Sequence, residues 1–357
     1  MKEQYFLGAN SPLGFFSLYE YFMNAQTDKT LYILKGGSGC GKSTFMRRIS
    51  NAAQEKGLDV EEVYCSADPS SLDALYLPAL KLGYVDGTAP HLLEPKFAGV
   101  FEQYLNLGAN YNIAGLHTEK ASIMDQIIKG KAPFKRAYDY LAASDKVWRE
   151  IITELTSDDL TKRLVKRSRG IIARELRQKS KHGTQAVKNR FITSLTHKGY
   201  SNCFHFAENS SDRIYHLDNS FGFAHIVLSE IKQAALSLGY NLTVCNNPLQ
   251  PTQIAHLIIP ELQLAFLSSD DLFQYTGKYD RHMRLDAMVD ADKIKKAKQR
   301  IKFSKKVRHM LIQEAISALG DAKKEHEILE RYYNPYINFS AIEHLADEHI
   351  RMLSDTC

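Results

Sequence analysis

Residues 31–44 read LYILKGGSGCGKST, and this stretch decides the fold of the N-terminal half of the chain. The apolar run 31–34 is short and is soon followed by glycines, which is typical of a buried parallel strand. Residues 43–56 then place apolar side chains on one face and stop at Gly57, as an amphipathic helix does. We therefore expect a strand, a glycine-rich loop and a helix in direct succession.

The loop matches the pattern G-x-x-x-x-G-K-[ST], in which every position has a physical role. Glycines let the backbone wrap a chain of phosphates, with successive N–H groups pointing inward. Lys42 offers a cation to the β- and γ-phosphates, Ser43 offers a hydroxyl to Mg²⁺, and the helix adds its positive end. We predict that ATP and Mg²⁺ bind here. The phosphate loop comprises Gly36, Gly37, Ser38, Gly39, Cys40, Gly41, Lys42, Ser43 and Thr44.

A nucleotide site of this kind also needs a carboxylate, at the end of a strand beside the loop strand, to hold Mg²⁺. Asp86 ends the predicted strand 80–85 and is the first candidate for this acid. The alternative is that Asp86 only begins a turn with Gly87. We predict that Ser43 and Asp86 are the protein ligands of Mg²⁺.

Two further side chains are candidates for the chemistry. Asp68 follows a predicted strand over 60–66 and could orient a water or a substrate hydroxyl, or with Ser70 it could cap a following helix. His91 could contact a phosphate or a substrate, or it could be a structural histidine in a loop. The candidate catalytic residues are therefore Lys42, Asp86, Asp68 and His91.

The chain contains this module twice. Residues 30–86 align without gaps with residues 212–268, at a constant offset of 182. The beginnings of the copies match at an offset of 185, for example Phe6 with Phe191, so a three-residue deletion in the second copy reconciles the two offsets. Strands alternating with helices predict a parallel sheet covered on both faces. In the second copy the strands are predicted at 214–217, 242–245 and 262–267.

The second copy lacks the residues that bind phosphate. Lys42 is matched by Ala224, and Gly36 is matched by Asp218, whose fixed negative charge repels phosphate. We therefore expect a degenerate second domain that binds no nucleotide in this way. The other mismatched pairs are Ser43 with His225, Gly41 with Phe223, Asp86 with Ser268, Asp68 with Gln250, and His91 with Phe273.

The fold class that follows is α/β, with two tandem three-layer domains of the P-loop NTPase type, parallel sheets and added helices. At 357 residues, two domains are the better expectation. The segments 97–182 and 284–357 are rich in helix formers and are expected to be helical. The expected divisions are a nucleotide-binding domain over 1–160, a basic helical linker over 161–189, and the degenerate domain with a helical C-terminal part over 190–357.

Composition points to an ordinary cytoplasmic protein. The chain is 44% hydrophobic and 24% charged, and it has no stretch of eighteen apolar residues that would span a membrane. Its first residues lack the apolar core of a secretory signal. The five cysteines are scattered, without the close pairs of a zinc or redox motif, and a reducing compartment suits them.

Two segments carry most of the excess positive charge. Residues 161–190 hold eleven Lys and Arg against one acid, and residues 293–308 hold nine and no acid. Such clusters could bind nucleic acid or another polyanion, with an affinity that falls steeply with salt. The alternative is two solvated helical faces. Arg281 or Arg284 could also reach the first site, as an arginine finger does.

The sequence resembles the tandem P-loop ATPases of Gram-positive bacteria, a mostly uncharacterised family. The resemblance covers nearly the whole chain. It implies ATP binding and hydrolysis. A small-molecule or nucleotide kinase, and an ATP-gated nucleic-acid-binding protein, remain alternatives. The motifs that carry the resemblance are Lys35–Thr44, Cys65–Asp73, Asp86–His91, His256–Leu262 and Leu329–Tyr333. Members of the family often carry a glycine-lysine loop in both halves, and this chain departs from them at 218–226.

Overall fold

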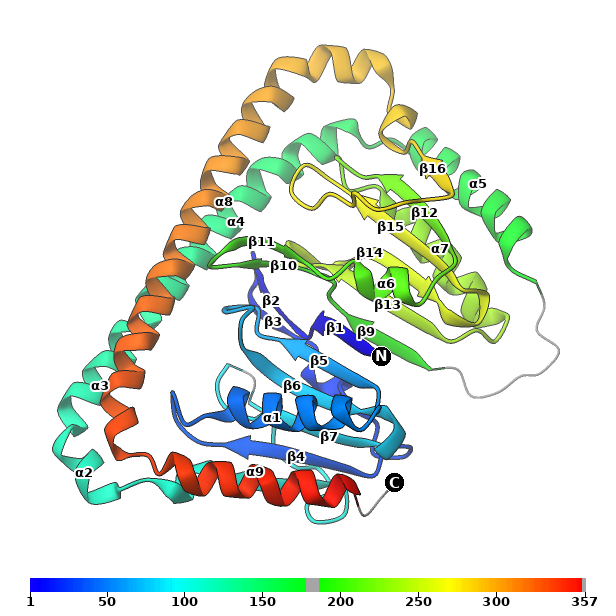
Figure 1. The fold of residues 1–357 in the computed structure, drawn as a ribbon. Helices are drawn as coiled ribbons and strands as arrows, with labels where there is room; N and C mark the ends of the chain where they lie inside the picture. Colours follow the sequence, from blue (N-terminus) through cyan, green and yellow to red (C-terminus); the bar gives the residue numbers. More distant parts are fainter. Residues whose placement is uncertain (91, 178–185, 355–357) are drawn as a thin grey trace.

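The computed structural model describes residues 1–90, 92–177 and 186–354. Two similar α/β domains are present, each built on a six-stranded sheet with helices packed against it (Figure 1). Among the described helices, none is both long enough and apolar enough to cross a membrane.

The two sheets have the same strand order. The first sheet runs β1-β5-β6-β7-β4-β8, and the second runs β9-β13-β14-β15-β12-β16 when it is read from its equivalent edge. The internal repeat predicted from the sequence is therefore confirmed. The first set of strands is β1 (Lys2–Phe6), β4 (Thr30–Lys35), β5 (Val60–Tyr64), β6 (Leu72–Leu77), β7 (Leu82–Asp86) and β8 (Glu102–Asn106). The second is β9 (Val187–Arg190), β12 (Arg213–Asp218), β13 (Leu242–Asn247), β14 (Gln250–Ile259), β15 (Leu264–Ser269) and β16 (Arg281–Met283).

The sheets are mixed and mostly parallel, which corrects the prediction of fully parallel sheets. Strand β6 runs antiparallel to both β5 and β7, and β14 does the same between β13 and β15. The reason is the short connection on either side of β6. A parallel neighbour needs a crossover of a dozen or more residues, whereas an antiparallel neighbour needs only a tight turn. Strand β6 is not among the strands that the sequence predicts.

The strand register refines the alignment of the copies. Thr30 pairs with Leu82, and Arg213 pairs with Leu264, so β12 is shifted by 183 residues from β4 while β15 keeps the offset of 182 from β7. The gapless alignment was therefore wrong by one residue at this strand. Asp218 is the counterpart of Lys35 and not of Gly36, and the loop between strand and helix is one residue shorter in the second copy.

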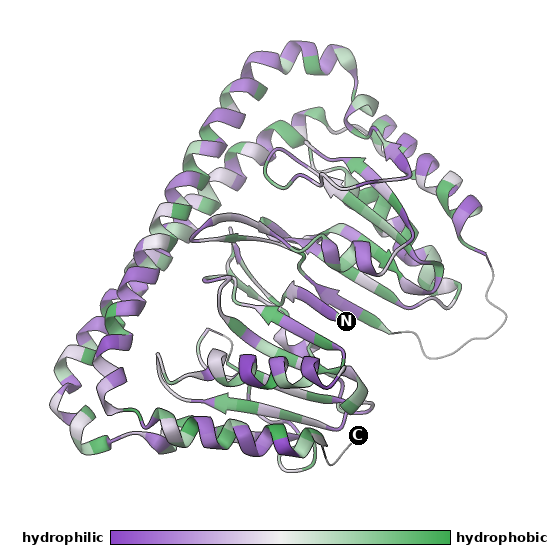
Figure 2. Cartoon of the chain, viewed as in Figure 1, coloured by the Kyte–Doolittle hydropathy of each residue, from purple (hydrophilic) through white to green (hydrophobic). Residues whose placement is uncertain are grey.

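One hydrophobic core cluster contains strand residues of both domains. Each sheet turns one face toward the other domain, and Phe6 and Phe191 exchange backbone hydrogen bonds of 2.8 and 2.9 Å at their junction. These two residues occupy equivalent positions in the repeat, so they lie at the pseudo-twofold axis that relates the copies. Figure 2 shows apolar strands in both domains. Each sheet is covered on both faces, as predicted, but the other half of the chain contributes to covering the second face, which refines the expected three-layer arrangement.

The helices that follow each copy pack on the other copy. Helices α4 (Lys131–Leu155) and α8 (Ala291–Tyr333) run side by side along one side of both domains (Figure 1). Helix α5 (Asp158–Glu175) then packs on α7 (Ala224–Ser237) of the second domain, and α9 (Phe339–Ser354) packs on α1 (Lys42–Glu55) of the first. The chain therefore exchanges helices between its own two halves.

The described helices agree with most of the sequence prediction. The predicted helix at 43–56 is α1, and the segment 284–357 is mainly α8 and α9. Strand β8 is the exception within 97–182, which otherwise contains α2 (Ile113–Thr118), α3 (Lys120–Lys129), α4 and α5. The remaining short helix is α6 (His205–Asn209), and two hairpins lie near the domain junction, β2 (Gly8–Ser11) with β3 (Gly14–Ser17) and β10 (Thr193–Thr196) with β11 (Gly199–Asn202).

Candidate nucleotide site

The phosphate loop joins the carboxyl end of β4 to the amino end of α1. Gly41 precedes the helix with φ of 81°, in the left-handed region that favours glycine, and Gly39 has φ of 70°. Lys42 is the first helical residue, and its Nζ donates to the carbonyl oxygens of Gly36 at 2.8 Å and Gly37 at 3.0 Å. The ammonium group is thus held over the loop, where it and the helix N-terminus both provide positive charge.

Asp86 lies beside this lysine. Strand β7 pairs in parallel with β4, so Leu34 is opposite Asp86 at the carboxyl edge of the sheet. Its Oδ2 is 3.6 Å from Lys42 Nζ, while Oδ1 accepts hydrogen bonds from the N–H of Thr88 at 2.9 Å and from its hydroxyl at 2.6 Å. Both interpretations of Asp86, as a metal ligand and as a turn residue, therefore have a structural basis, since one oxygen supports the turn and the other faces the loop.

The residues near the loop provide oxygen donors of the kind that Mg²⁺ prefers. Ser43 lies in the first turn of α1, and its Oγ accepts the N–H of Leu72 at 2.9 Å. The carboxylate of Asp86 ends the strand beside the loop strand. Mg²⁺ is usually held by one or two protein oxygens together with waters and substrate phosphates. A hydroxyl and a carboxylate at the phosphate loop fit that requirement.

Asp68 lies in a turn between β5 and β6 and is paired with a lysine from the far end of the chain. Its Oδ2 is 3.0 Å from Nζ of Lys323 on α8, and its Oδ1 accepts the N–H of Ser70 at 3.0 Å. Burial disfavours the charged form, but the hydrogen bonds from Ser70 and Lys323 outweigh it and lower the pKa of Asp68 to about 2. The helix-cap alternative was wrong, because a strand and not a helix follows this turn.

The end of α8 covers the phosphate loop. Oγ of Ser38 lies 3.1 Å from Nε2 of His326. A Cβ atom added to Gly39 would lie 2.8 Å from Oδ1 of Asn334 and 3.1 Å from Cγ of Glu330. These contacts explain why glycine occupies position 39, and they place an acidic side chain next to a loop suited to phosphate.

Two tyrosines complete this cover. The hydroxyl of Tyr111 accepts the N–H of Gly37 at 2.5 Å, and the rings of Tyr111 and Tyr333 lie 6.0 Å apart. A Cβ atom at Gly37 would meet both side chains within 3.3 Å. The loop is therefore contacted by segments from both halves of the chain.

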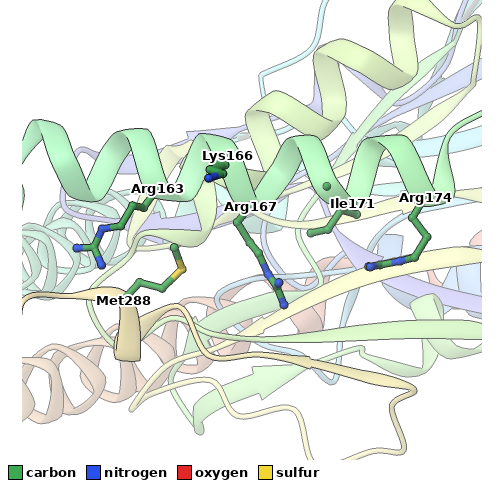
Figure 3. Close-up of a pocket in the computed structure, with 7 residues that line it drawn as sticks. Arg163, Lys166, Arg167, Ile171, Arg174 and Met288 are labelled. Carbon is green, nitrogen blue, oxygen red and sulfur yellow. The ribbon is translucent and has the colours of Figure 1, made fainter.

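A basic hollow lies on the second domain, away from the phosphate loop. It has a volume of about 450 Å³ and is lined by Arg163, Lys166, Arg167 and Arg174 of α5, with Met288 on its other side (Figure 3). Arg174 also bonds to Glu175 at 2.9 Å and to the hydroxyl of Tyr215 at 2.7 Å. Some of the cationic side chains of the predicted basic segment 161–190 therefore lie together on this surface.

The equivalent loop of the second copy is occupied by a side chain of its own and by side chains of α4. Oδ1 of Asn219 accepts the N–H of Ala224, the residue equivalent to Lys42, at 2.7 Å. Ile152 of α4 lies near Gly222, and Trp148 stacks on Phe221 at 6.1 Å. This loop is also one residue shorter than the loop between β4 and α1.

The structure brings Lys42, Ser43 and Asp86 to one edge of the first sheet and sets Asp68 against α8. Arg281 belongs to β16 of the second domain, where it pairs with Tyr215. In the described part of the chain, Lys323 of the second half lies beside the candidate residue Asp68. Sequence reasoning missed it because nothing in a long helix indicates which turn reaches another domain. His91 lies outside the described residues.

Comparisons of the chain with protein-family models, with curated proteins and with solved structures found no match. The likeness to the tandem P-loop ATPases therefore remains a resemblance carried by motifs. What the structure adds is the architecture itself, two similar α/β domains with mixed six-stranded sheets.

Proposed function

We propose that the N-terminal domain binds ATP with Mg²⁺ at the phosphate loop and hydrolyses it. One observation carries the proposal, namely that the parallel pairing of β4 with β7 sets Asp86 3.6 Å from Lys42 at the start of α1. A cation, a helix N-terminus and a carboxylate at the carboxyl edge of a sheet are what a Mg²⁺–triphosphate requires. The adenine base rests on the family resemblance and on the absence of an N-K-x-D guanine signature in the sequence.

The residues around the loop suggest how the reaction is promoted. Lys42 and the loop amides stabilise the charge on the transferring phosphate, while Ser43 and Asp86 hold Mg²⁺. With a pKa of about 2, Asp68 is ionised at neutral pH but is a weak base. Its role in the proposal is therefore to orient the attacking group, with Lys323 holding the carboxylate in place.

Turnover of γ-labelled ATP tests this function. With Mg²⁺ present, the label is expected in inorganic phosphate, both with and without added metabolite pools. The D86N variant is expected to lose roughly 100-fold in turnover, because the metal contributes several kcal/mol to transition-state stabilisation. D59N, at an exposed aspartate, is the matched control and should keep full activity.

The alternatives give different outcomes in the same assay. Label transferred to a small molecule indicates a kinase, whereas no Mg²⁺-dependent release or transfer of label contradicts the proposed chemistry. A turnover of D86N equal to that of the native chain would show that Asp86 is not the metal ligand.

A second candidate function is ATP-gated binding of nucleic acid, and the hollow on α5 is the observation that favours it. Arg163, Lys166 and Arg167 line one surface there, as phosphate contacts require. We expect single-stranded RNA to bind with an affinity that falls by about tenfold or more between low and physiological salt. Changing Lys166 and Arg167 to glutamine should reduce both the affinity and its salt dependence, and equal binding by the variant would exclude this surface.

A further inference from the structure

Three side chains at one edge of the second sheet form a cluster that the nucleotide site does not use. His216 and Asp218 are two residues apart on β12, so their side chains point to the same face of the sheet. His282 on β16 lies directly opposite His216 in the parallel register. The alternate residues Tyr215 and Leu217 pack into the core with α7 on the other face. Three polar side chains therefore meet on one side of two adjacent strands.

The distances in this cluster suit a bound ion. Each of the three side chains has a ligand atom within 4.8 Å of the others, and Nε2 of His282 is 2.6 Å from Oδ1 of Asp218. Metal–ligand bonds of about 2.0–2.2 Å need ligand atoms roughly 3–3.5 Å apart. Binding an ion would therefore require these side chains to rotate from their present positions. The side chains of Asp218 and His282 are each 32% exposed, so an ion and its waters can enter from solvent.

The hydrogen bonds of His216 leave one ring nitrogen for a ligand bond. Nε2 lies 2.8 Å from Oγ of Ser269, and this hydroxyl also accepts the N–H of Tyr275 at 2.8 Å. Within the part of the chain that the structure describes, Nδ1 of His216 is buried and has no hydrogen-bond partner. Histidines that bind metals commonly bond through the second nitrogen to such a neighbour, which fixes the tautomer and the ring.

The first copy shows that the fold does not require this cluster. By strand register, His216, Asp218 and His282 correspond to Ile33, Lys35 and Tyr104. There the lysine Nζ lies 5.4 Å from the centre of the tyrosine ring, and the set offers no metal ligands. The same backbone positions thus carry an apolar residue, a cation and a phenol in one domain, and two imidazoles and a carboxylate in the other.

We propose that His216, Asp218 and His282 form a binding site for a divalent transition-metal ion such as Zn²⁺. Two imidazoles and one carboxylate favour such ions over Mg²⁺ or Ca²⁺, which prefer oxygen ligands alone. Three protein ligands leave at least one coordination position for water or another small ligand. The domain that has lost the phosphate loop therefore keeps a ligand site of a different chemistry at the same edge of its sheet.

The test uses the full untagged chain after chelator treatment, titrated with Zn²⁺ against a chromophoric chelator. We expect one Zn²⁺ per chain, and a loss of roughly 100-fold or more in affinity for H282Y, since changes beyond the direct ligands already cost 10–100-fold. Tyrosine is the residue that the first copy carries at this position, which makes H282Y compatible with the strand. D218N should weaken binding as well, whereas H344A, at an exposed histidine of α9, should bind as the native chain does.

A second readout separates this site from the cysteines. Co²⁺ bound here is expected to give visible bands without the charge-transfer absorption of a cobalt–thiolate bond. Absence of stoichiometric Zn²⁺ binding, equal affinity in folded H282Y, or a thiolate band would each overturn the proposal. Circular dichroism confirms that the variants are folded. K42A should leave Zn²⁺ binding unchanged, so the outcome does not depend on the nucleotide site.

Discussion

ATP affinity is expected to fall by roughly 100-fold or more when Lys42 is replaced by alanine. The ammonium group of Lys42 lies over the loop, with Nζ 2.8 and 3.0 Å from two loop carbonyl oxygens. In this position its positive charge would stabilise the phosphates of a bound nucleotide. A hydrogen bond to a charged group contributes about 1.5–3 kcal/mol, and Lys42 can make two of them. Its removal also leaves the Asp86 carboxylate facing the phosphates without a neutralising cation. Isothermal titration with a non-hydrolysable ATP analogue and Mg²⁺ measures the change.

The control for K42A is a second lysine of the same helix region. Lys56 follows the last residue of α1, is exposed, and lies at the opposite end of the helix from the loop. K56A should bind the analogue with native affinity. If K42A also bound it with native affinity, the phosphate loop would not be the nucleotide site. Thermal melts without nucleotide show whether Lys42 also supports the loop through its bonds to Gly36 and Gly37.

Much of this site could be predicted from the sequence because its signals are local. The spacing of glycines, Lys42 and Ser43 specifies the loop, and the strand before it and the helix after it occur where the pattern places them. The position of Asp86 needed one further step, namely that parallel strands end at the same edge of a sheet. The pairing of Leu34 with Asp86 agrees with that step.

The rest of the fold and of the candidate site depends on contacts between residues that are far apart in the sequence. The apolar face of an amphipathic helix indicates that the helix packs on another element, but it does not indicate which element. The packing of α9 on α1 therefore had no sequence signal. For the same reason Lys323 could not be assigned to Asp68, 255 positions away. The register of β12 was missed because a one-residue deletion in a loop hardly changes an alignment score, yet it moves every side chain of a strand to the other face.

The cover over the phosphate loop has a consequence for nucleotide binding. Glu330 and Asn334 lie where a side chain at Gly39 would be, and Tyr333 lies against Gly37. A triphosphate in the loop would lie close to the negative charge of Glu330, and it would clash with the side chains that fill this space. Binding of ATP in the loop would therefore require the end of α8 to move.

Removing α9 is expected to destabilise the first domain more than the second. The buried side of this helix includes Ile342, Ala346 and Leu353, which are 4%, 1% and 1% exposed, and they complete the core that contains Phe45 and Tyr84. Burial of a large aliphatic side chain contributes about 1.5–3 kcal/mol, so the loss is roughly 3–6 kcal/mol before polar contacts are counted. That is a large fraction of the 5–15 kcal/mol that stabilises a typical protein.

His349 adds to the cost of this truncation. Its ring lies 4.7 Å from that of Tyr32, and its Nδ1 lies 3.1 Å from the hydroxyl of Tyr84. Burial lowers the pKa of His349, so the ring is neutral in its place under the sheet. Without α9, the hydroxyl of Tyr84 loses this partner and the apolar face of the sheet is opened to water.

Hydrogen exchange on a chain ended after Asn338 measures the result domain by domain. Amides of β4 and β7 should lose more protection than those of β12 and β15, because α5 and not α9 packs on the second domain. The substitutions H344A and E348A, at an exposed pair of side chains on α9, control for the composition of the helix and should leave both domains protected. Equal protection of β4 in the truncated and native chains would contradict the exchange of helices between the halves, since a domain that is complete within residues 1–160 would not need residues beyond 338.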